Sequence, residues 1–333
     1  MNAVAAMVDA LEQAPPPAAA LDGPAVARLA ADSGALAALR AGGEPTALVE
    51  LACALGAIGA ANLLIPHVVL PALLAPGTAV DGTATVALGE GADDLDLDAV
   101  ACRFEGGALS GAKPLVSAAA GFARHALIAA VAAEGTVLVD APLAGDGVAV
   151  SPLRTIGRGG DADLVFTAVE IAPEAVVAGA GALAERLAEA LPTIALVQAA
   201  EGRGMLEAML ALAVAHGNER EAFGRPIGSF QAFQHACADI AMDVELVAAM
   251  VDHGAAAPSR AGALRARLFV AEAVVAGSRA ALQLQGGAGF LDEHPVSRLY
   301  RQAKESQLRW GSLERRQDEV WADEMARGEG RER

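Results

Sequence analysis

The chain has 333 residues, a formal net charge of −17 and a hydrophobic fraction of 54%, with only 3% aromatic residues. This length allows one large domain or two to three smaller ones. The acidic balance excludes a basic nucleic-acid-binding surface, since no positive patch is present to displace the counterions of a phosphate backbone. The abundance of alanine favours a mostly helical protein, because alanine has the highest helix propensity.

The sequence indicates a soluble protein in a reduced, cytoplasmic setting. Cys53, Cys102 and Cys237 have neither a CxxC nor a metal-ligand spacing. The opening "MNAVAAMVDALEQAPPP" carries acids in place of the basic start of an export peptide. Residues 51–80 contain no formal charge and are long enough to cross a bilayer. Prolines interrupt this stretch and no Lys or Arg cluster flanks it, so we favour a buried helix pair over a membrane span.

The first part of the chain predicts short helices followed by strands. The first 44 residues are rich in Ala, Pro and Gly, and the proline run 15–17 ends any helix that begins before it. Residues 44–74 are typical of two helices with a break at Pro66 or Pro71. Between 77 and 179, short runs rich in Val, Leu and Thr alternate with turn residues, and "FEGGALSG" is typical of a hairpin.

After residue 179 the pattern becomes helical. Apolar residues recur at helical spacing through "ALAERLAEALPTIALVQAAEGRGMLEAMLALAVAHGNER", where an interruption near Pro192 is expected. Further helices are predicted at about 228–253, 263–283, 294–308 and 312–326, and the tail "RGEGRER" is expected to fray. The fold class is therefore mainly α with a middle β-domain, in three parts: shortened N-terminal helices (1–76), a β-barrel or sandwich (77–179) and a C-terminal four-helix bundle (180–333).

One stretch concentrates the scarce aromatic residues. "REAFGRPIGSFQAFQHACAD" places Phe223, Phe230 and Phe233 beside Arg220 and Arg225. A planar guanidinium beside an aromatic ring can clamp a pyrophosphate and stack on an adenine or flavin edge. The alternative is a surface cation near a helix end together with phenylalanines of the core.

A second stretch, "LQLQGGAGFLDEHP", places adjacent glycines at the end of a predicted helix. Glycines without a Cβ let the backbone approach a ligand closely. On spacing alone, a helix C-cap followed by a turn is the more common arrangement. The stretch is not a dinucleotide-binding fingerprint, because no strand precedes it and GGxG differs from GxGxxG.

Together, these two motifs and the order of the three parts resemble the acyl-CoA dehydrogenase family over residues 44–326. "HPVSRLYRQAK" is similar to the family's penultimate helix and "LSGAKPLVSAAAGFARHALIAA" to a segment of its β-domain. The resemblance implies FAD-dependent α,β-dehydrogenation of an acyl-CoA thioester. It also implies that the adenine-diphosphate end of a neighbouring chain's flavin is held by six residues: Arg220, Phe223, Gln231, Gln283, Gly286 and Gly287.

The sequence departs from the family at the two usual positions of the proton-abstracting glutamate. One of these positions is Trp310, in "LRWGSLERR", and the other is Ile194. Neither side chain can accept a proton, so no catalytic base stands at a usual position. The motifs that cradle the isoalloxazine ring are also missing from "VALGEGADDLDLDAV" and "KPLVSAA". We interpret the acids of the first of these stretches as a solvated loop, and no metal site is expected because no histidine joins them.

Three hypotheses follow. The leading one is the subunit of a hetero-oligomeric acyl-CoA dehydrogenase that lacks the glutamate, similar to the short subunits of steroid side-chain enzymes. A longer dehydrogenase subunit would be its partner, in an α2β2 assembly or, failing that, a homotetramer. The second is a self-sufficient flavoenzyme with a relocated base. The weak candidates for this base are Glu201, Glu207 and Glu305. The favoured interpretation of these glutamates is that they lie on the ordinary surface of a helix. The third is a non-redox binding or scaffold protein on this fold.

Overall fold

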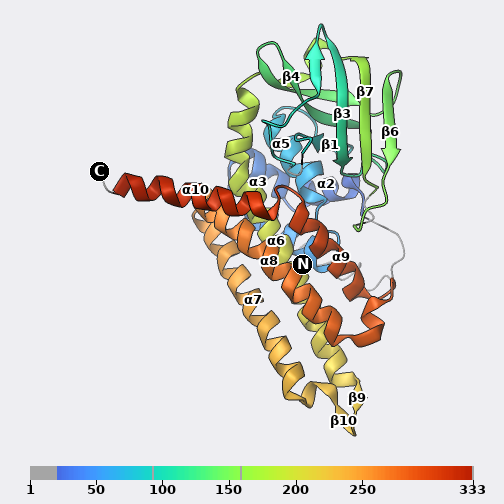
Figure 1. The fold of residues 1–333 in the computed structure, drawn as a ribbon, viewed down its shortest axis with the longest axis vertical. Helices are drawn as coiled ribbons and strands as arrows, with labels where there is room; N and C mark the ends of the chain where they lie inside the picture. Colours follow the sequence, from blue (N-terminus) through green and yellow to red (C-terminus); the bar gives the residue numbers. More distant parts are fainter. Residues whose placement is uncertain (1–20, 92–93, 158–159, 332–333) are drawn as a thin grey trace.

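The computed structural model describes residues 21–91, 94–157 and 160–331, with side chains described as far as residue 326. The proline run 15–17 lies outside these ranges. Figure 1 shows the sheet at one end of the molecule, the N-terminal helices next to it and the bundle extending away from both. The N-terminal part contains α2 (Gly23–Asp32), α3 (Ala35–Ala41), α4 (Thr46–Ala57), the π-helical turn η1 (Ile65–Val69) and α5 (Leu70–Leu74).

The predicted break at Pro66 or Pro71 is wrong, because the interruption falls earlier, at residues 58–63. Pro66 stands in the first turn of η1, where the missing N–H has no intrahelical partner to lose. Pro71 lies where η1 passes into α5, and the helix continues through it to Leu74. Residues 51–80 contain the end of α4 and all of η1 and α5, and Leu55 and Ile65 are fully buried. Within the described ranges, no helix is both long and apolar enough to cross a membrane.

Glycines let α4 lie directly against the first helix of the bundle. A Cβ on Gly56 would stand 2.0 Å from the carbonyl oxygen of Glu201, and a Cβ on Gly204 would stand 1.9 Å from that of Cys53. Any larger side chain at either position would push the two helices apart. This contact fixes the N-terminal helices over the part of the bundle that carries Glu201.

The strands predicted between 77 and 179 form one eight-stranded sheet in the order β6-β7-β3-β2-β4-β5-β8, with β1 pairing in parallel with β4. "FEGGALSG" forms the predicted hairpin, in which Phe104 of β2 pairs with Leu109 of β3. The sheet packs around apolar side chains such as Ile128 and Phe166. Strand bounds are β1 (Ala84–Ala87), β2 (Arg103–Glu105), β3 (Ala108–Val116), β4 (His125–Ala132), β5 (Gly135–Pro142), β6 (Val148–Pro152), β7 (Ala162–Glu170) and β8 (Val176–Ala178), with a short η2 (Pro173–Ala175) before the last.

Long helices make up the rest of the chain. α6 runs without interruption through Pro192, so the expected break there is wrong; packing against α4, α7 and α8 holds the helix together. α10 continues to Arg331, so the backbone of the tail does not fray before that residue. The bounds are α6 (Ala182–Glu219), β9 (Glu221–Ala222), β10 (Arg225–Pro226), η3 (Ile227–Ser229), α7 (Gln231–Ala256), α8 (Arg260–Leu284), η4 (Gly286–Phe290), α9 (Pro295–Leu308) and α10 (Leu313–Arg331).

Candidate functional site

The first motif forms a tight hairpin at the tip of the bundle, labelled β9 and β10 in Figure 1. Its two central residues, Phe223 and Gly224, have φ angles of 54° and 79°. Two successive positive φ angles define the two-residue turn that matches the twist of a hairpin. A phenylalanine in this region is strained, and such strain is typical of positions under a functional constraint.

The hairpin presents an aromatic and cationic surface to the exterior. Phe223 is 96% exposed, so its interpretation as a core residue is wrong. Its ring meets that of Phe230 edge-on with centroids 6.2 Å apart. The guanidinium carbon of Arg225 lies 4.1 Å from the centroid of the Phe230 ring. Arg225 was not among the predicted cofactor residues, although its place in the same motif could have pointed to it.

The second motif lies at the same end of the bundle. The side chain of the buried Gln285 donates a hydrogen bond to the carbonyl of Leu212 on α6, at 2.9 Å. This bond ties the end of α8 to the last turns of α6. Gly286 follows with a φ of 60°, and a Cβ placed on Gly286 or Gly287 would meet no atom within 4 Å. The backbone of the two glycines is therefore open to a ligand.

All six predicted cofactor residues are exposed at this end of the molecule. Three of them carry polar side chains: Arg220, Gln231 and Gln283. Within the part of the chain that the structure describes, these three make no side-chain hydrogen bond or ion pair. A cation, two amides, two aromatic rings that meet edge-on and open glycine backbone form a set that fits the phosphates and the adenine of a flavin nucleotide.

The opposite end of the bundle is closed by the chain's own side chains. Trp310 is 2% exposed and has a φ of 58°. Its backbone N–H donates to Asp94 Oδ2 at 2.9 Å, and its carbonyl accepts from the Arg267 guanidinium, whereas its indole Nε1 is buried with no hydrogen-bond partner among the described residues. Ile194, at the other usual base position, is fully buried. The indole therefore fills the place where the family has a glutamate, and backbone contacts hold it there.

Arg309 closes the side that faces the β-domain. Its guanidinium donates to the carbonyl of Leu115 at 2.7 Å and to Asp161 Oδ1 at 3.1 Å. Asp161 is 1% exposed and also accepts a hydrogen bond from Thr155 Oγ1 at 2.7 Å. Leu115 and Ala118, in the "KPLVSAA" stretch, have φ angles of 51° and 50°. The segment expected to support an isoalloxazine ring is thus bound by the arginine that directly follows α9.

Of the three weak base candidates, Glu201 is buried and the side chain of Glu305 is largely buried, so their interpretation as ordinary helix surface is wrong. Glu201 is 1% exposed, and both its carboxylate oxygens lie 3.3 Å from the backbone nitrogen of Asn62, which donates to them. Burial, followed by repulsion from Glu305, raises the pKa of Glu201 to about 8. The Glu305 side chain is 12% exposed. Burial raises the pKa of Glu305 to about 7, although nearby Arg309 acts in the opposite direction.

Asn62 joins the elements around these acids. Its side-chain oxygen accepts from Ser306 Oγ at 2.9 Å, whereas its Nδ2 and the Oε1 of Gln302 are buried without a hydrogen-bond partner. Glu207 differs from the other two candidates, since it is 43% exposed in its side chain and pairs with Arg203. The surface interpretation is correct for Glu207 alone.

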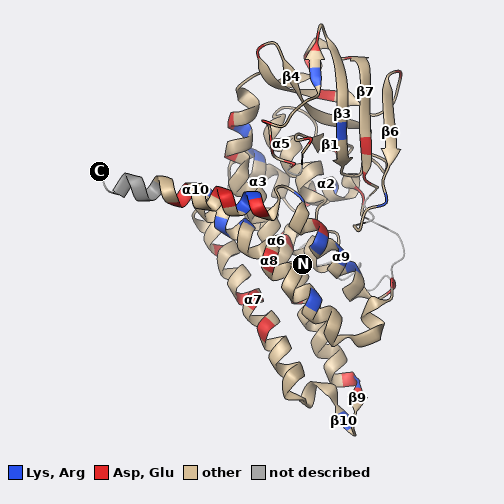
Figure 2. Cartoon of the chain, in the orientation of Figure 1, with Lys and Arg blue, Asp and Glu red and all other residues tan. Residues whose placement is uncertain are grey.

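The acidic stretch before β2 is not simply a solvated loop. Glu90 forms an ion pair of 2.6 Å with Lys113, whose side chain is fully buried. Asp94 anchors Trp310, and Asp96 pairs with Arg315 of α10 at 3.1 Å. Figure 2 shows charged residues gathered where α9 leads into α10. The solvated-loop interpretation is therefore wrong, because these carboxylates meet basic side chains from β3 and α10.

Flavin therefore fits one end of this chain and not the other. The tip offers unpaired polar side chains and open backbone to a cofactor from outside. At the junction of bundle and β-domain, Trp310 and Arg309 occupy the space, and the backbone of Trp310 and the guanidinium of Arg309 are hydrogen-bonded to this chain's own residues.

Comparison with known proteins agrees with this geometry. Residues 183–323 match the family model described as acyl-CoA dehydrogenase, C-terminal domain. The acyl-CoA dehydrogenase IpdE2 of Mycolicibacterium smegmatis is 40% identical over 111 residues, which cover 33% of this chain and 36% of that protein. The chain thus spans about a third of the length of that curated relative.

Solved structures match over nearly the whole chain. FkbI, for the biosynthesis of the methoxymalonyl extender unit of a polyketide, has a TM-score of 0.82 and 25% identity and covers 97% of this chain and 99% of its own. A chain of the ChsE4–ChsE5 complex from Mycobacterium tuberculosis has a TM-score of 0.77 and 24% identity, with coverages of 97% and 96%. Residues 183–323 thus match the C-terminal domain of the acyl-CoA dehydrogenase family, and the described chain as a whole has the fold of solved acyl-CoA dehydrogenases.

Proposed function

We propose that this chain is a subunit of a hetero-oligomeric, FAD-dependent acyl-CoA dehydrogenase that carries out α,β-dehydrogenation of an acyl-CoA thioester. A longer dehydrogenase chain would supply the glutamate and the isoalloxazine cradle, in an α2β2 assembly. One contrast carries the proposal: the tip that would receive a neighbour's cofactor is open, whereas the chain's own catalytic position is filled by Trp310.

Each residue at the tip has a defined task in this proposal. The Arg220 guanidinium neutralises the pyrophosphate, and Gln231 and Gln283 offer amide hydrogen bonds. Phe223 and Phe230 offer aromatic faces for the adenine. Gly286 and Gly287 let the backbone come close to the phosphates. When bound, the flavin accepts a hydride from the β-carbon of the acyl group.

Relatives support the subunit reading. The solved structure of ChsE4–ChsE5 is named as a complex of two proteins, and a chain of it shares this fold. We carry that arrangement to the present chain as part of the proposal. The proposed division at 76/77 and 179/180 falls between secondary-structure elements. The cytoplasmic setting stays a proposal as well, supported by three cysteines that are all free thiols.

The test of the tip is Arg220→Ala in the assembled complex. Loss of a charge-assisted bond to the pyrophosphate should weaken flavin binding by about tenfold to a hundredfold. Flavin absorbance per complex after gel filtration measures the loss, and circular dichroism should be unchanged because Arg220 is exposed. Arg28→Ala, an exposed arginine on α2, is the control and should keep full flavin content. Equal flavin content in the two variants would remove Arg220 from the cofactor site.

A second candidate function is a self-sufficient enzyme in which Glu305 is the base. The observation that favours it is a largely buried carboxyl whose pKa of about 7 suits proton transfer near neutral pH. Glu305 lies toward the β-domain, since a Cβ on Gly157 would stand 1.8 Å from Glu305 Oε2. Glu201 faces the N-terminal helices through Asn62 and is a weaker candidate.

Glu305→Gln separates the two functions. In the subunit proposal the glutamate of the partner chain abstracts the proton, so acyl-CoA oxidation by the complex should change less than threefold. If Glu305 is the base, oxidation should fall by about a hundredfold or more, the size of a general-base contribution. A dye-reduction assay with saturating acyl-CoA measures either result.

Restoring the glutamate at the usual position should not create an independent enzyme. Trp310→Glu returns a carboxylate, but Arg309 still binds Leu115 and Asp161 across the cradle. We expect no acyl-CoA oxidation above background by this variant alone. Robust turnover without a partner would contradict the proposal that the chain lacks half of the catalytic site.

A protein that stays colourless even when it is produced together with the longer chain would favour the third hypothesis, a non-redox binding or scaffold protein.

A further inference from the structure

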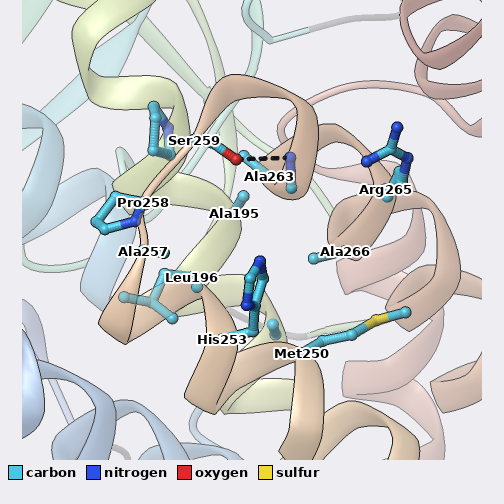
Figure 3. A pocket seen from close by; sticks show the side chains of 14 residues that line it. Ala195, Leu196, Met250, His253, Ala257, Pro258, Ser259, Ala263, Arg265 and Ala266 are labelled. Atoms are coloured by element: carbon cyan, nitrogen blue, oxygen red, sulfur yellow. Dashed lines mark hydrogen bonds between the residues drawn. The ribbon is translucent and has the colours of Figure 1, made fainter. Parts of the chain in front are cut away.

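A cavity of about 210 Å³ lies between α6, α7 and α8. Figure 3 shows Ala195 and Leu196 of α6 on one side, His253 and Met250 of α7 below, and Ala263 and Ala266 of α8 opposite. Its walls are mostly alanine, glycine and proline, and these small side chains leave the space open. The cavity is larger than the roughly 150 Å³ that is enough for a benzene molecule in an apolar protein interior.

Most polar groups at the edge of the cavity already have partners. The hydroxyl of Ser259 accepts the N–H of Gly262 at 3.1 Å and caps α8. The guanidinium of Arg265 pairs with Glu324 of α10. The imidazole of His253, an exposed residue at the rim, is different: within the described ranges its ring makes no hydrogen bond or ion pair. Figure 3 shows this ring pointing up toward Ala263. The site therefore offers an apolar interior and one polar group.

The cavity is separate from the junction that holds Trp310. Pro192, Leu196 and Ala199 follow each other at helical spacing and form the cavity face of α6. Ile194 and Glu201 lie on another face of the same helix, toward the N-terminal helices and α9. A ligand in the cavity would thus touch neither the proposed flavin tip nor the buried acids.

We propose that this cavity binds a small neutral molecule with a ring-sized apolar body and a single hydroxyl that hydrogen-bonds to His253. The cavity opens to solvent at its rim, and its mostly apolar walls offer no partner to a charged group, so a charged ligand would lose hydration there without compensation. The Arg265–Glu324 pair leaves no unbalanced charge at the mouth that would attract an anion. This site goes beyond the proposed dehydrogenase function and does not depend on it.

The probe for the test is 4-fluorophenol, followed by ¹⁹F NMR on the purified full chain and on its complex. For a ligand of this size we expect saturable binding with a dissociation constant of about 0.1–1 mM. Fluorobenzene, which lacks the hydroxyl, should bind roughly three- to tenfold more weakly. His253→Ala should remove this difference by lowering the affinity for 4-fluorophenol to that for fluorobenzene.

Filling the cavity should abolish binding. Ala263→Leu places a larger side chain in the wall, and Ala263→Val is a milder version if the first variant does not fold. Ala276→Leu on the exposed face of α8 is the matched control and should bind the probe like the wild type. The absence of saturable binding to the wild-type chain and complex, or equal binding to the Ala263→Val and Ala276→Leu variants, would overturn the proposal.

Discussion

Replacing Glu201 by glutamine is expected to make the protein more stable in alkaline solution, by roughly 3–5 kcal/mol relative to wild type at pH 9. Glutamine keeps the shape of the protonated acid and can still accept the Asn62 N–H. It cannot ionise, so the buried position no longer has to hold a negative charge. The free energy of unfolding, measured by urea denaturation at several pH values, tests this expectation.

The pH dependence of stability follows from the direction in which burial shifts the pKa of Glu201. The pKa of Glu201 is raised from 4.5 to about 8 in the folded chain, so the folded state holds this proton more tightly than the unfolded state. The resulting stabilisation is complete below pH 4.5 and is lost progressively as the pH rises to about 8. Wild type should therefore lose stability across this window, and Glu201→Gln should lose less.

Glu207→Gln is the matched control. Glu207 lies on the same helix, has a side chain that is 43% exposed and pairs with Arg203. An exposed pair contributes less than about 1 kcal/mol, so the pH profile of this variant should follow that of wild type. If the free energy of unfolding of wild type and of Glu201→Gln depends on pH in the same way, ionisation of the buried Glu201 carboxyl does not destabilise the folded chain.

The second large effect is expected at Asp161. Asp161→Ala removes the carboxylate that the buried Arg309 contacts at 3.1 Å and leaves its positive charge with weaker partners. Breaking a buried pair from one side costs about 3–5 kcal/mol, so we expect a loss of this size in the free energy of unfolding. Glu105→Ala, in a pair whose side chains are 67% and 70% exposed, should change stability by less than about 0.5 kcal/mol.

A double variant tests whether Asp161 acts through Arg309. Arg309→Met removes the buried charge and keeps a side chain of similar length. Combined with Asp161→Ala, it should be less destabilising than the sum of the two single changes, by about 1–3 kcal/mol. If the two single changes are additive in the free energy of unfolding, the destabilisation by Asp161→Ala comes from the lost hydrogen bond between Thr155 and Asp161.

The sequence predicted where both motifs of the tip lie but not their conformation. It placed one motif between two predicted helices and the other at the end of a helix, because those signals are local. The hairpin of β9 and β10 was not predicted, and the exposed position of Phe223 was only one of two alternatives left open. Helix types and most strand positions also followed from local signals, the periodicity within each segment.

The junction could not be predicted, because its contacts join residues far apart in the chain. Glu201 and Asn62 are 139 positions apart, and Arg309 and Asp161 are 148 apart. A glutamate in a helical pattern is usually exposed, and only the close approach of α4 at Gly56 buries this one. The acids before β2 likewise find basic partners on β3 and α10 that no local pattern indicates.

The most direct test of the central claim is the ratio of flavin to chain. The protein would be purified alone and together with the proposed longer acyl-CoA dehydrogenase chain, and flavin would be counted by absorbance and native mass spectrometry. We predict no flavin on the chain alone and one flavin for each pair of unlike chains in the complex. One flavin per chain in an oligomer of this chain alone would contradict the account and direct attention to Glu305.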